Sequence, residues 1–279
     1  MTEIAGRTVL VTGAASGLGR LIALRCARLG GRLALWDLDG PGVDRVADEI
    51  AAHTGVRCHA DRVDVSAGAQ VYPAADAVRA HVGDVDVLVN NAGIMHGGTL
   101  TDLPDEAVEA TFRVNVLSLF WVTKAFLPAM VARNRGHIVT MGSASGRIGV
   151  ARLSAYAASK HAAVGFDESL RAELRQLAPG VRTTQVNPYY VATGLAEGAR
   201  SRYPRLLPIL EPDAVAARVV DAVRRDRLVV EMPWLVKATP WLRFLPPRVF
   251  DRIADTLGIN VSMNDFVGRH GSTDATRVA

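Results

Sequence analysis

Short apolar runs alternate with longer stretches of helical period along most of the chain, and this alternation limits the possible folds more than any other feature. Runs such as Leu33 to Trp36 and Val85 to Val89 are almost continuously apolar, as in parallel strands that are buried on both faces. Strands that alternate with helices form βαβ units, which build a parallel sheet covered by helices on both sides. The sequence therefore predicts an α/β fold with a doubly wound parallel sheet of seven strands.

These patterns also predict the bounds of the elements and of the domain. We expect strands over residues 7–12, 32–36, 56–61, 85–90, 137–141, 181–186 and 227–231. We expect helices over residues 17–29, 41–53, 67–82, 104–132, 153–177 and 212–225. We expect one domain over residues 1–268, because no repeat or linker divides residues 1–231. A proline- and aromatic-rich extension occupies residues 232–268, and residues 269–279 are expected to form a flexible tail.

The composition is that of an ordinary globular chain. It is 49% hydrophobic and 22% charged, which excludes intrinsic disorder, collagen and coiled coil. Its 279 residues are at or just above the length of one compact α/β domain. Lys and Arg number 32 against 28 Asp and Glu, and this excess is spread along the chain. We therefore do not expect nucleic acid as a partner.

The sequence lacks the marks of export, membrane insertion and metal binding. We expect Cys26 and Cys58 to be buried thiols in a reducing compartment. No signal-like segment and no run of 18 apolar residues is found, so we expect a soluble, cytoplasmic protein without an integral membrane segment. The histidines show no ligand spacing with carboxylates or cysteines, so no metal is expected.

A glycine-rich turn follows the first predicted strand. Gly13, Gly17 and Gly19 lie just before a helical stretch. Glycines in this place allow a tight turn and let a pyrophosphate approach the backbone N–H groups of the helix N-terminus. Three residues separate the first two glycines, unlike the common G-x-G-x-x-G, and glycine-rich turns also occur as plain structure. The turn alone therefore leaves both interpretations open.

Asp37 supports the binding of a dinucleotide. It ends the second predicted strand, 18 residues past Gly19, where a carboxylate can accept hydrogen bonds from the adenosine ribose and repels a 2′-phosphate. Leu38 follows it, where an arginine would favour that phosphate. We therefore expect NAD as the cofactor. The alternatives are that Asp37 is a solvated acid at a strand end, or that Arg20 and Arg32 bind the phosphate of NADP.

A second group of polar residues points to proton transfer. Tyr156 and Lys160 are four residues apart in a predicted helix and so share one face. A phenol has a pKa of about 10, so it needs a nearby cation to act as a base near neutrality. Ser143 ends the fifth predicted strand, where its hydroxyl can hold a substrate oxygen, and Asn115 is an amide in an apolar helix that must find partners. Each residue alone also fits a structural role.

Together these residues resemble the short-chain dehydrogenase/reductases. The resemblance covers about residues 5–231 and implies a Rossmann-type fold, a nicotinamide cofactor and hydride transfer. It is carried, in order and at the intervals of the family, by Thr12-Gly13-x-x-x-Gly17-x-Gly19, Asn90-Asn91-Ala92-Gly93, Asn115, Ser143 and Tyr156-x-x-x-Lys160.

The resemblance also implies a role for each residue. Tyr156 would be the general acid/base, Lys160 would lower its pKa and bind the nicotinamide ribose, and Ser143 would position the substrate oxygen. Asn115 would hold a water molecule in the proton relay. The cofactor residues that it implies are Gly13, Ser16, Gly17, Leu18, Gly19, Asp37, Leu38, Asp64, Val65, Asn91, Ala92, Gly93, Tyr156, Lys160, Pro188, Val191 and Thr193.

Other stretches are similar to the branch with the retinol dehydrogenases and 17β-hydroxysteroid dehydrogenase type 11, which act on apolar alcohols. They are Leu119 to Met130, Gly136 to Val139 and Gly165 to Leu170. Tyr189 departs from the family pattern, which usually has glycine after Pro188. We expect a bulky apolar alcohol or its ketone as substrate, with Arg147 facing solvent. The expected substrate contacts are Met95, Ser145, Ile148, Leu153, Tyr189 and Leu195.

The remaining segments suggest a lid and an interface. Residues 194–210 follow a strand end as an insertion, which is typical of a substrate lid. The aromatic run from Trp234 to Phe250 would complete this lid or form a subunit contact; the alternative is a membrane surface, with Lys237, Arg243 and Arg248 facing lipid headgroups. The long apolar helices resemble those of the family's dimers, so we expect a homodimer or homotetramer.

Two other functions remain open. A 3-oxoacyl thioester reductase usually takes NADPH, which Asp37 disfavours. A non-catalytic dinucleotide sensor would usually have lost the tyrosine or the lysine, and both are present here.

Overall fold

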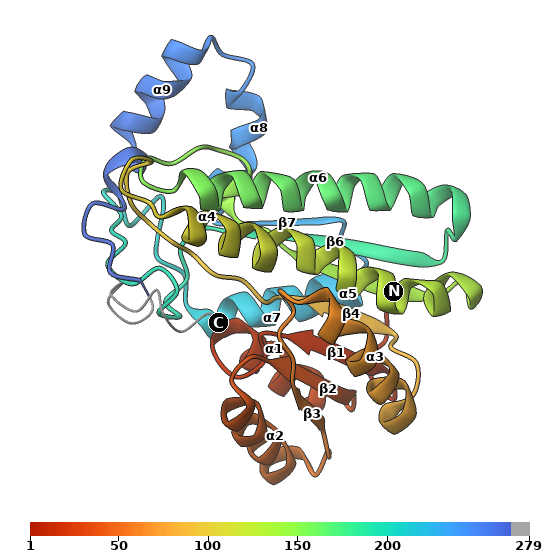
Figure 1. Ribbon diagram of the computed structural model, residues 1–279. Helices are drawn as coiled ribbons and strands as arrows, with labels where there is room; N and C mark the ends of the chain where they lie inside the picture. Colours follow the sequence, from red (N-terminus) through yellow and green to blue (C-terminus); the bar gives the residue numbers. More distant parts are fainter. Residues whose placement is uncertain (269–279) are drawn as a thin grey trace.

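A single seven-stranded sheet in the order β3-β2-β1-β4-β5-β6-β7 forms the centre of the computed structural model, which describes residues 1–268 (Figure 1). Every pair of neighbouring strands is parallel. The predicted doubly wound α/β fold is confirmed, and the predicted tail, 269–279, lies outside the described residues. The strands are β1 (Thr8–Thr12), β2 (Arg32–Asp37), β3 (His59–Arg62), β4 (Val87–Asn90), β5 (Gly136–Met141), β6 (Val181–Pro188) and β7 (Val229–Met232).

Helices cover both faces of the sheet. The α-helices are α1 (Gly17–Arg28), α2 (Gly40–Thr54), α3 (Gly68–Val82), α4 (Asp105–Phe112), α5 (Ser118–Ala132), α6 (Ser154–Leu177), α7 (Pro212–Arg224), α8 (Thr239–Leu242) and α9 (Pro247–Thr256). Shorter turns are η1 (Arg113–Leu117), η2 (Ala144–Gly146), η3 (Trp234–Ala238) and η4 (Ile259–Val261).

Two apolar cores result from this arrangement, one on each side of the sheet. Val9 and Val11 of β1 pack into the core that includes α1, α2 and α7. Leu10, between them, packs into the opposite core with α3, α5 and α6. Successive side chains of a strand point to opposite faces, so a strand covered on both sides is apolar along its whole length.

Two predicted elements differ most from those found. The third strand begins at His59 rather than at residue 56. The predicted helix over 104–132 is interrupted by a π-helical turn, η1, which contains the buried Asn115. π-helical turns are rare and occur mostly at functional sites. Hydrophobic period alone does not distinguish such a turn from continuous α-helix, because the apolar residues continue through it.

Within residues 1–268, one helical stretch, Asp105–Ala132, is long and apolar enough to cross a membrane, with a mean hydropathy of 1.5. This stretch comprises α4, η1 and α5. It contacts α3, α6 and strands β4 and β5, and 44% of its most apolar window is buried. Its position is that of a helix that covers one face of the sheet.

The direction of chain winding reverses between β1 and β4. In open α/β sheets, ligands bind beyond the carboxyl ends of the strands at this point. Thr12, the last residue of β1, accepts hydrogen bonds at its hydroxyl from the backbone N–H groups of Asn91 and Ala92, each at 3.0 Å. The Asn91 side chain donates in return to the Thr12 carbonyl at 2.9 Å. The two halves of the sheet are therefore joined where a ligand would lie.

Asp167 of α6 is a fully buried carboxylate. An Arg171 nitrogen lies 3.5 Å from one of its oxygens. Burial raises the pKa of Asp167 from 3.8 to about 6, although the Arg171 guanidinium acts in the opposite direction. The folded protein therefore binds this proton more tightly than the unfolded chain does.

We predict that Asp167→Asn stabilises the protein at neutral pH. Because the folded pKa is raised, the ionised carboxylate destabilises the fold above about pH 6, by about 3 kcal/mol, and this penalty disappears as the pH falls to about 4. Urea unfolding at pH 7.5 should show the gain, and unfolding at pH 4 should not. The exposed Glu173→Gln on the same helix is the control. A gain of equal size at both pH values would contradict the prediction.

Candidate active site

A long open cleft runs over the carboxyl ends of β1, β2 and β4. We call it the long cleft. Most of the predicted cofactor residues line it, namely Gly13, Ser16, Gly17, Leu18, Asp37, Leu38, Asp64, Val65, Asn91, Ala92, Gly93 and Thr193. The structure therefore brings together residues that are far apart in the sequence.

The glycine turn at one wall of this cleft depends on the lack of side chains. Gly13 and Gly17 have φ angles of +66° and +54°, in the left-handed region that favours glycine. Gly19 does not line the cleft. A Cβ atom there would overlap the Gly13 carbonyl oxygen, so this glycine allows α1 to begin close against the turn. The backbone at the start of α1 is thereby left open to the cleft, which fits a pyrophosphate.

Asp37 has two structural contacts besides facing the cleft. One carboxylate oxygen accepts a hydrogen bond from the Ala15 N–H at 2.9 Å, and the other accepts from the Asp39 N–H at 3.0 Å. Each carboxylate oxygen has a further lone pair. The carboxylate can therefore brace the glycine turn and still accept a hydrogen bond from a ribose hydroxyl.

The arginines that the sequence suggested as alternative ligands of a 2′-phosphate do not lie free beside Asp37. Arg20 is paired with Glu49, whose carboxylate accepts its Nε–H at 2.7 Å. Arg32 begins β2 and so lies at the other end of that strand. Arg62 was missed: it ends β3, is paired in register with Asp37, and donates from Nε to the Leu38 carbonyl at 3.1 Å. The sequence could have indicated Arg62 by its position at the end of a strand. The third strand was predicted to end at residue 61, so Arg62 was placed outside it.

A cavity of about 600 Å³ adjoins the long cleft and is lined by Ser143, Tyr156 and Lys160. We call it the Tyr156 cavity. Lys160 donates from Nζ to the Met141 carbonyl at the end of β5, at 2.8 Å, and Nζ lies 5.7 Å from the centre of the Tyr156 ring. Both side chains are buried. Spacing of four residues on α6 therefore aligns the phenol and the ammonium against the end of β5, as predicted.

Burial drives both groups toward their neutral forms. It raises the pKa of Tyr156 to about 12, against the effect of the neighbouring Ser143 hydroxyl, and it lowers the pKa of Lys160 to about 8. This differs from the expectation that Lys160 holds the phenol pKa low. The ammonium is itself desolvated and hydrogen-bonded to a carbonyl. The phenol in this arrangement is a proton donor at neutral pH.

Asn115 joins three parts of the site. Its Oδ1 accepts from the Ile94 N–H at 2.9 Å, and its Nδ2 donates to the Ile94 carbonyl at 2.9 Å and to the Ser159 hydroxyl at 3.0 Å. Both amide protons are therefore engaged, and one lone pair of Oδ1 remains. The side chain fixes the segment after β4 to α6, one residue away from Lys160.

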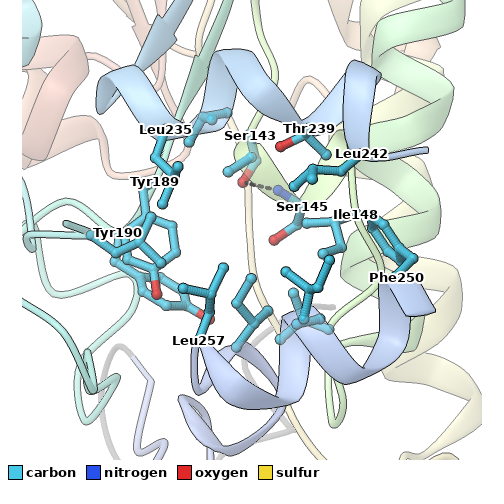
Figure 2. Close-up of a pocket in the computed structure, with 17 residues that line it drawn as sticks. Ser143, Ser145, Ile148, Tyr189, Tyr190, Leu235, Thr239, Leu242, Phe250 and Leu257 are labelled. Carbon is cyan, nitrogen blue, oxygen red and sulfur yellow. Dashed lines mark hydrogen bonds between the residues drawn. The ribbon is translucent and has the colours of Figure 1, made fainter. Parts of the chain in front are cut away.

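A second cavity, of about 680 Å³, shares Ser143, Tyr189 and Tyr190 with the Tyr156 cavity. We call it the apolar cavity. Figure 2 shows its side chains arranged around an open centre. No charged side chain of the described residues lines it. The other lining residues are Ala144, Ser145, Ile148, Val150, Leu207, Leu235, Val236, Thr239, Leu242, Phe250, Ile253, Ala254, Leu257 and Ile259.

The predicted substrate contacts are mostly found at these two cavities. Ser145, Ile148 and Tyr189 line the apolar cavity, whereas Met95 and Leu195 line the Tyr156 cavity, as do Pro188 and Val191. The prediction for Leu153 was wrong. It lines neither cavity and is fully buried in a cluster with Tyr156, Tyr190 and Met263.

The outer wall of the apolar cavity lies largely in the run from Trp234 to Phe250, which the sequence predicted would complete a lid or form a subunit contact, but the residues that line the cavity were not identified. It comes from η3, α8 and α9, which contribute Leu235, Leu242, Phe250, Ile253 and Leu257 among others. These elements are short and separated by prolines, so they carry no long periodic pattern. The signal available was the concentration of aromatic and aliphatic residues in the extension. Within residues 1–268, no group of histidines, cysteines and carboxylates could hold a metal ion.

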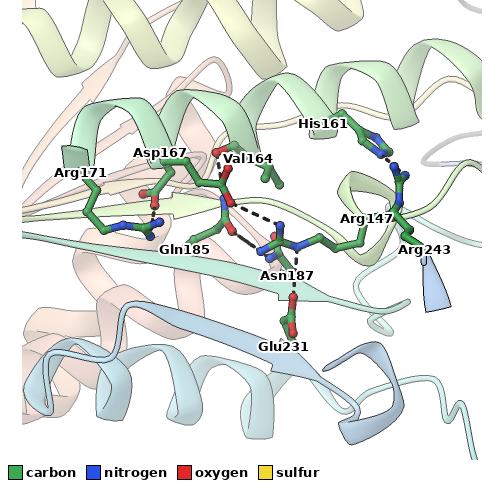
Figure 3. A network of polar contacts seen from close by, with 10 residues as sticks. Arg147, His161, Val164, Asp167, Arg171, Gln185, Asn187, Glu231 and Arg243 are labelled. Atoms are coloured by element: carbon green, nitrogen blue, oxygen red, sulfur yellow. Dashed lines mark hydrogen bonds and ion pairs between the residues drawn. The ribbon is translucent and has the colours of Figure 1, made fainter. Parts of the chain in front are cut away.

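Arg147 ends the short turn η2 that follows Ser143, and its expected exposure to solvent was wrong (Figure 3). It donates from Nε to Glu231 at 3.1 Å and from Nη2 to Gln185 at 2.9 Å. The side chains of Arg147 and Glu231 are only 18% and 10% exposed. Arg147 therefore ties the Ser143 loop to strands β6 and β7.

We predict that Arg147→Met destabilises the protein by about 3 kcal/mol, because it leaves the Glu231 carboxylate buried without its partner. Arg147→Lys should lose less, since a lysine keeps the charge but cannot reach both acceptors. Urea unfolding measures both. The exposed pair of Arg225 and Asp221 supplies the control, in which Arg225→Met should cost under about 1 kcal/mol. Equal losses in the free energy of unfolding for Arg147→Met and Arg225→Met would contradict the prediction that the buried ion pair is the more important of the two.

Comparison with known proteins gives consistent matches over most of the chain. Residues 7–204 match the family model described as short chain dehydrogenase. Epidermal retinol dehydrogenase 2 from Mus musculus is 43% identical over 274 residues, which cover 97% of this chain and 88% of the relative. Estradiol 17-beta-dehydrogenase 11 from Homo sapiens is 41% identical over 248 residues, covering 88% and 81%. A solved short chain dehydrogenase/reductase from Burkholderia phymatum, in complex with NAD, has a TM-score of 0.80 at 31% identity and covers 93% of this chain and 98% of that one.

Proposed function

The chain belongs to the short-chain dehydrogenase family and is an oxidoreductase, and from this premise we propose that it interconverts a bulky apolar alcohol and its ketone or aldehyde, with NAD as cofactor. One observation carries the proposal: the apolar cavity and the Tyr156 cavity share Ser143. A substrate body in the first would place its oxygen beside the hydroxyl groups of the second.

The residues of the long cleft fit NAD. The open start of α1 suits the pyrophosphate, and the free lone pairs of Asp37 suit the ribose hydroxyls. Bound NAD would supply the hydride acceptor. The solved relative from Burkholderia phymatum, which is described in complex with NAD, supports this choice.

Tyr156 and Lys160 would manage the proton. In the reductive direction, the neutral Tyr156 phenol would donate its proton to the substrate carbonyl oxygen, which the Ser143 hydroxyl would hold, and the reduced cofactor would supply the hydride for the carbonyl carbon. In the oxidative direction the phenol must first lose its proton. That loss is favoured by positive charge nearby, from Lys160 and from an oxidised nicotinamide ring. Ser143 then positions the alcohol oxygen while Tyr156 takes its proton.

The substrate class follows from the apolar cavity. It is lined almost entirely by aliphatic and aromatic side chains, as small-molecule sites usually are. Its lining has no charged group in the described residues that could bind a phosphate or carboxylate. This favours an alicyclic, steroid- or retinol-like alcohol over a thioester on a phosphorylated carrier. The names of the retinol and estradiol dehydrogenases among the relatives point the same way.

The proposed assembly is a homodimer or homotetramer. Phe120 of α5 is exposed, and its ring lies 4.9 Å from that of Phe166 of α6, centre to centre. The exposed Leu117 lies three residues before Phe120. These residues would form an apolar face on two long helices, which supports an interface there. A cytoplasmic location remains part of the proposal.

We predict that Tyr156→Phe abolishes most of the activity. NADH formation from a panel of alicyclic secondary alcohols and apolar primary alcohols should fall by about 10² to 10⁴-fold, because the proton acceptor is lost. The affinity for NAD should change little. The exposed Tyr72→Phe on α3 is the matched control. Equal rates for wild type and Tyr156→Phe would refute the mechanism, and tight NAD binding without turnover of any alcohol would favour a sensor.

We predict that Asp37 sets the cofactor preference. The wild-type protein should use NAD at least about tenfold better than NADP, as judged by kcat/KM, because the carboxylate repels a 2′-phosphate. Asp37→Asn should lower the ratio of kcat/KM for NAD to that for NADP, mainly because it weakens the binding of NAD. Asp39→Asn, two residues further along the same rim, is the control and retains a good helix N-cap. Parity between the two cofactors in the wild type would favour the thioester reductase.

A further inference from the structure

The segment from Trp234 to Thr256 folds into a projecting helical hairpin, which we call the C-terminal hairpin. It comprises η3, α8 and α9. Figure 1 shows α8 and α9 standing out from the body beyond the start of α6, with the loop between them at the far tip.

Large aromatic side chains are exposed on this hairpin. Trp234, Trp241 and Phe244 are 64%, 73% and 84% exposed. The rings of Trp241 and Phe244 lie 6.3 Å apart, centre to centre, and the exposed Leu245 follows them. Large apolar side chains gathered and exposed on one projecting element mark an interaction site. We call these four residues the aromatic patch.

The inner side of the same hairpin forms the outer wall of the apolar cavity. Leu242 of α8 and Phe250 of α9 point into the cavity (Figure 2), and Ile253 of α9 also lines it, whereas none of the four residues of the aromatic patch does. The hairpin is thus one helix layer between the cavity and the outside. Whatever covers the aromatic patch lies next to the cavity.

Basic residues accompany the aromatic patch. Lys237, Arg248 and Arg252 are exposed, and within residues 1–268 no ion pair engages any of them. With Arg243 they outnumber the two carboxylates of the hairpin, Asp251 and Asp255. Tryptophan and phenylalanine together with lysine and arginine are typical of segments that lie in a membrane interface.

Arg243 holds the hairpin in this position. It donates from Nε to the Arg147 carbonyl at 2.9 Å, and its Nη2 lies 3.1 Å from Nε2 of His161 on α6 (Figure 3). The His161 Nδ1 is 2.9 Å from the Ala157 carbonyl. These contacts anchor the hairpin to the body of the enzyme, so that the aromatic patch is presented outward rather than folded onto the core.

The charges favour a lipid surface over a second copy of the chain. A two-fold contact brings the same patch of both subunits face to face, which would set the unpaired cations of one hairpin near those of the other. Anionic headgroups instead complement these cations, and each Lys or Arg near such a surface contributes about 1 kcal/mol to binding. The aromatic rings would then lie at the level of the headgroups.

We propose that the C-terminal hairpin docks the protein onto a bilayer with anionic headgroups and that apolar substrate passes from this bilayer into the apolar cavity. The docking rests on the hairpin alone. The passage of substrate rests on the proposed function.

Docking is tested with the full chain and large unilamellar vesicles. Wild type should sediment with vesicles of equal parts phosphatidylcholine and phosphatidylglycerol, and at least about tenfold more weakly with phosphatidylcholine alone. Trp241→Ser/Phe244→Ser should weaken binding to the mixed vesicles by about tenfold or more. Lys237→Gln/Arg248→Gln should also weaken it, and added salt should reduce the wild-type affinity.

The matched control is Leu177→Ser/Leu228→Ser, which removes two exposed apolar side chains elsewhere on the surface and should bind vesicles like wild type. Docking is overturned if wild type does not bind the mixed vesicles, or if Trp241→Ser/Phe244→Ser binds them equally well. Docking is also overturned if the only effect of Trp241→Ser/Phe244→Ser is to abolish a concentration-dependent self-association. The aromatic patch would then bind a second copy of the chain.

The passage of substrate is tested with the apolar alcohol that the wild type turns over fastest. Loaded into the mixed vesicles, it should be oxidised about tenfold more slowly by Trp241→Ser/Phe244→Ser than by wild type. Presented in solution on cyclodextrin, it should be oxidised at similar rates by both. Equal rates from vesicles would overturn the passage while docking stands. Absence of turnover by wild type in either form would refute the proposed function and leave the sedimentation result unaffected.

Discussion

A parallel sheet that is covered on both faces leaves its carboxyl-end edge as the place where polar side chains can gather without disturbing a core, and the site of this enzyme is built along that edge. Thr12, Asp37, Ser143 and Thr193 all stand at or just beyond strand ends. Lys160 reaches the same edge from α6 and is held there by the Met141 carbonyl. The two apolar cores keep these ends in register, so the spacing of the polar groups is a property of the sheet.

Residues whose function depends on local spacing were predictable from the sequence. The glycines of the turn, Asp37 at a strand end, and Tyr156 and Lys160 on one helix face are each fixed by a short interval along the chain. That these residues lie close together in space follows from the topology of a doubly wound sheet, in which the carboxyl ends of the strands share one edge. For this reason the family, the fold and most of the residues around the long cleft could be predicted.

Features that depend on tertiary contacts could not be predicted in this way. The burial of Arg147 requires Gln185 and Glu231, which come from strands far along the chain. Leu153 is apolar and close to Tyr156 in sequence, but the direction of its side chain is set by packing against Met263 and its neighbours. The raised pKa of Tyr156 likewise reflects burial, which spacing along a helix does not reveal. The outer wall of the apolar cavity comes from short elements without a period.

The residues around the long cleft and those around the apolar cavity come largely from different parts of the chain, and this separation has an evolutionary consequence. The residues that line the long cleft and the Tyr156 cavity lie within residues 7–204, which match the family. Much of the wall around the apolar cavity lies after β7, in η3, α8 and α9. Mutations in this late segment can reshape what the enzyme accepts without touching the sheet edge that carries out the chemistry. Substrate range can therefore diverge between descendants of one ancestor by changes in a few dozen terminal residues.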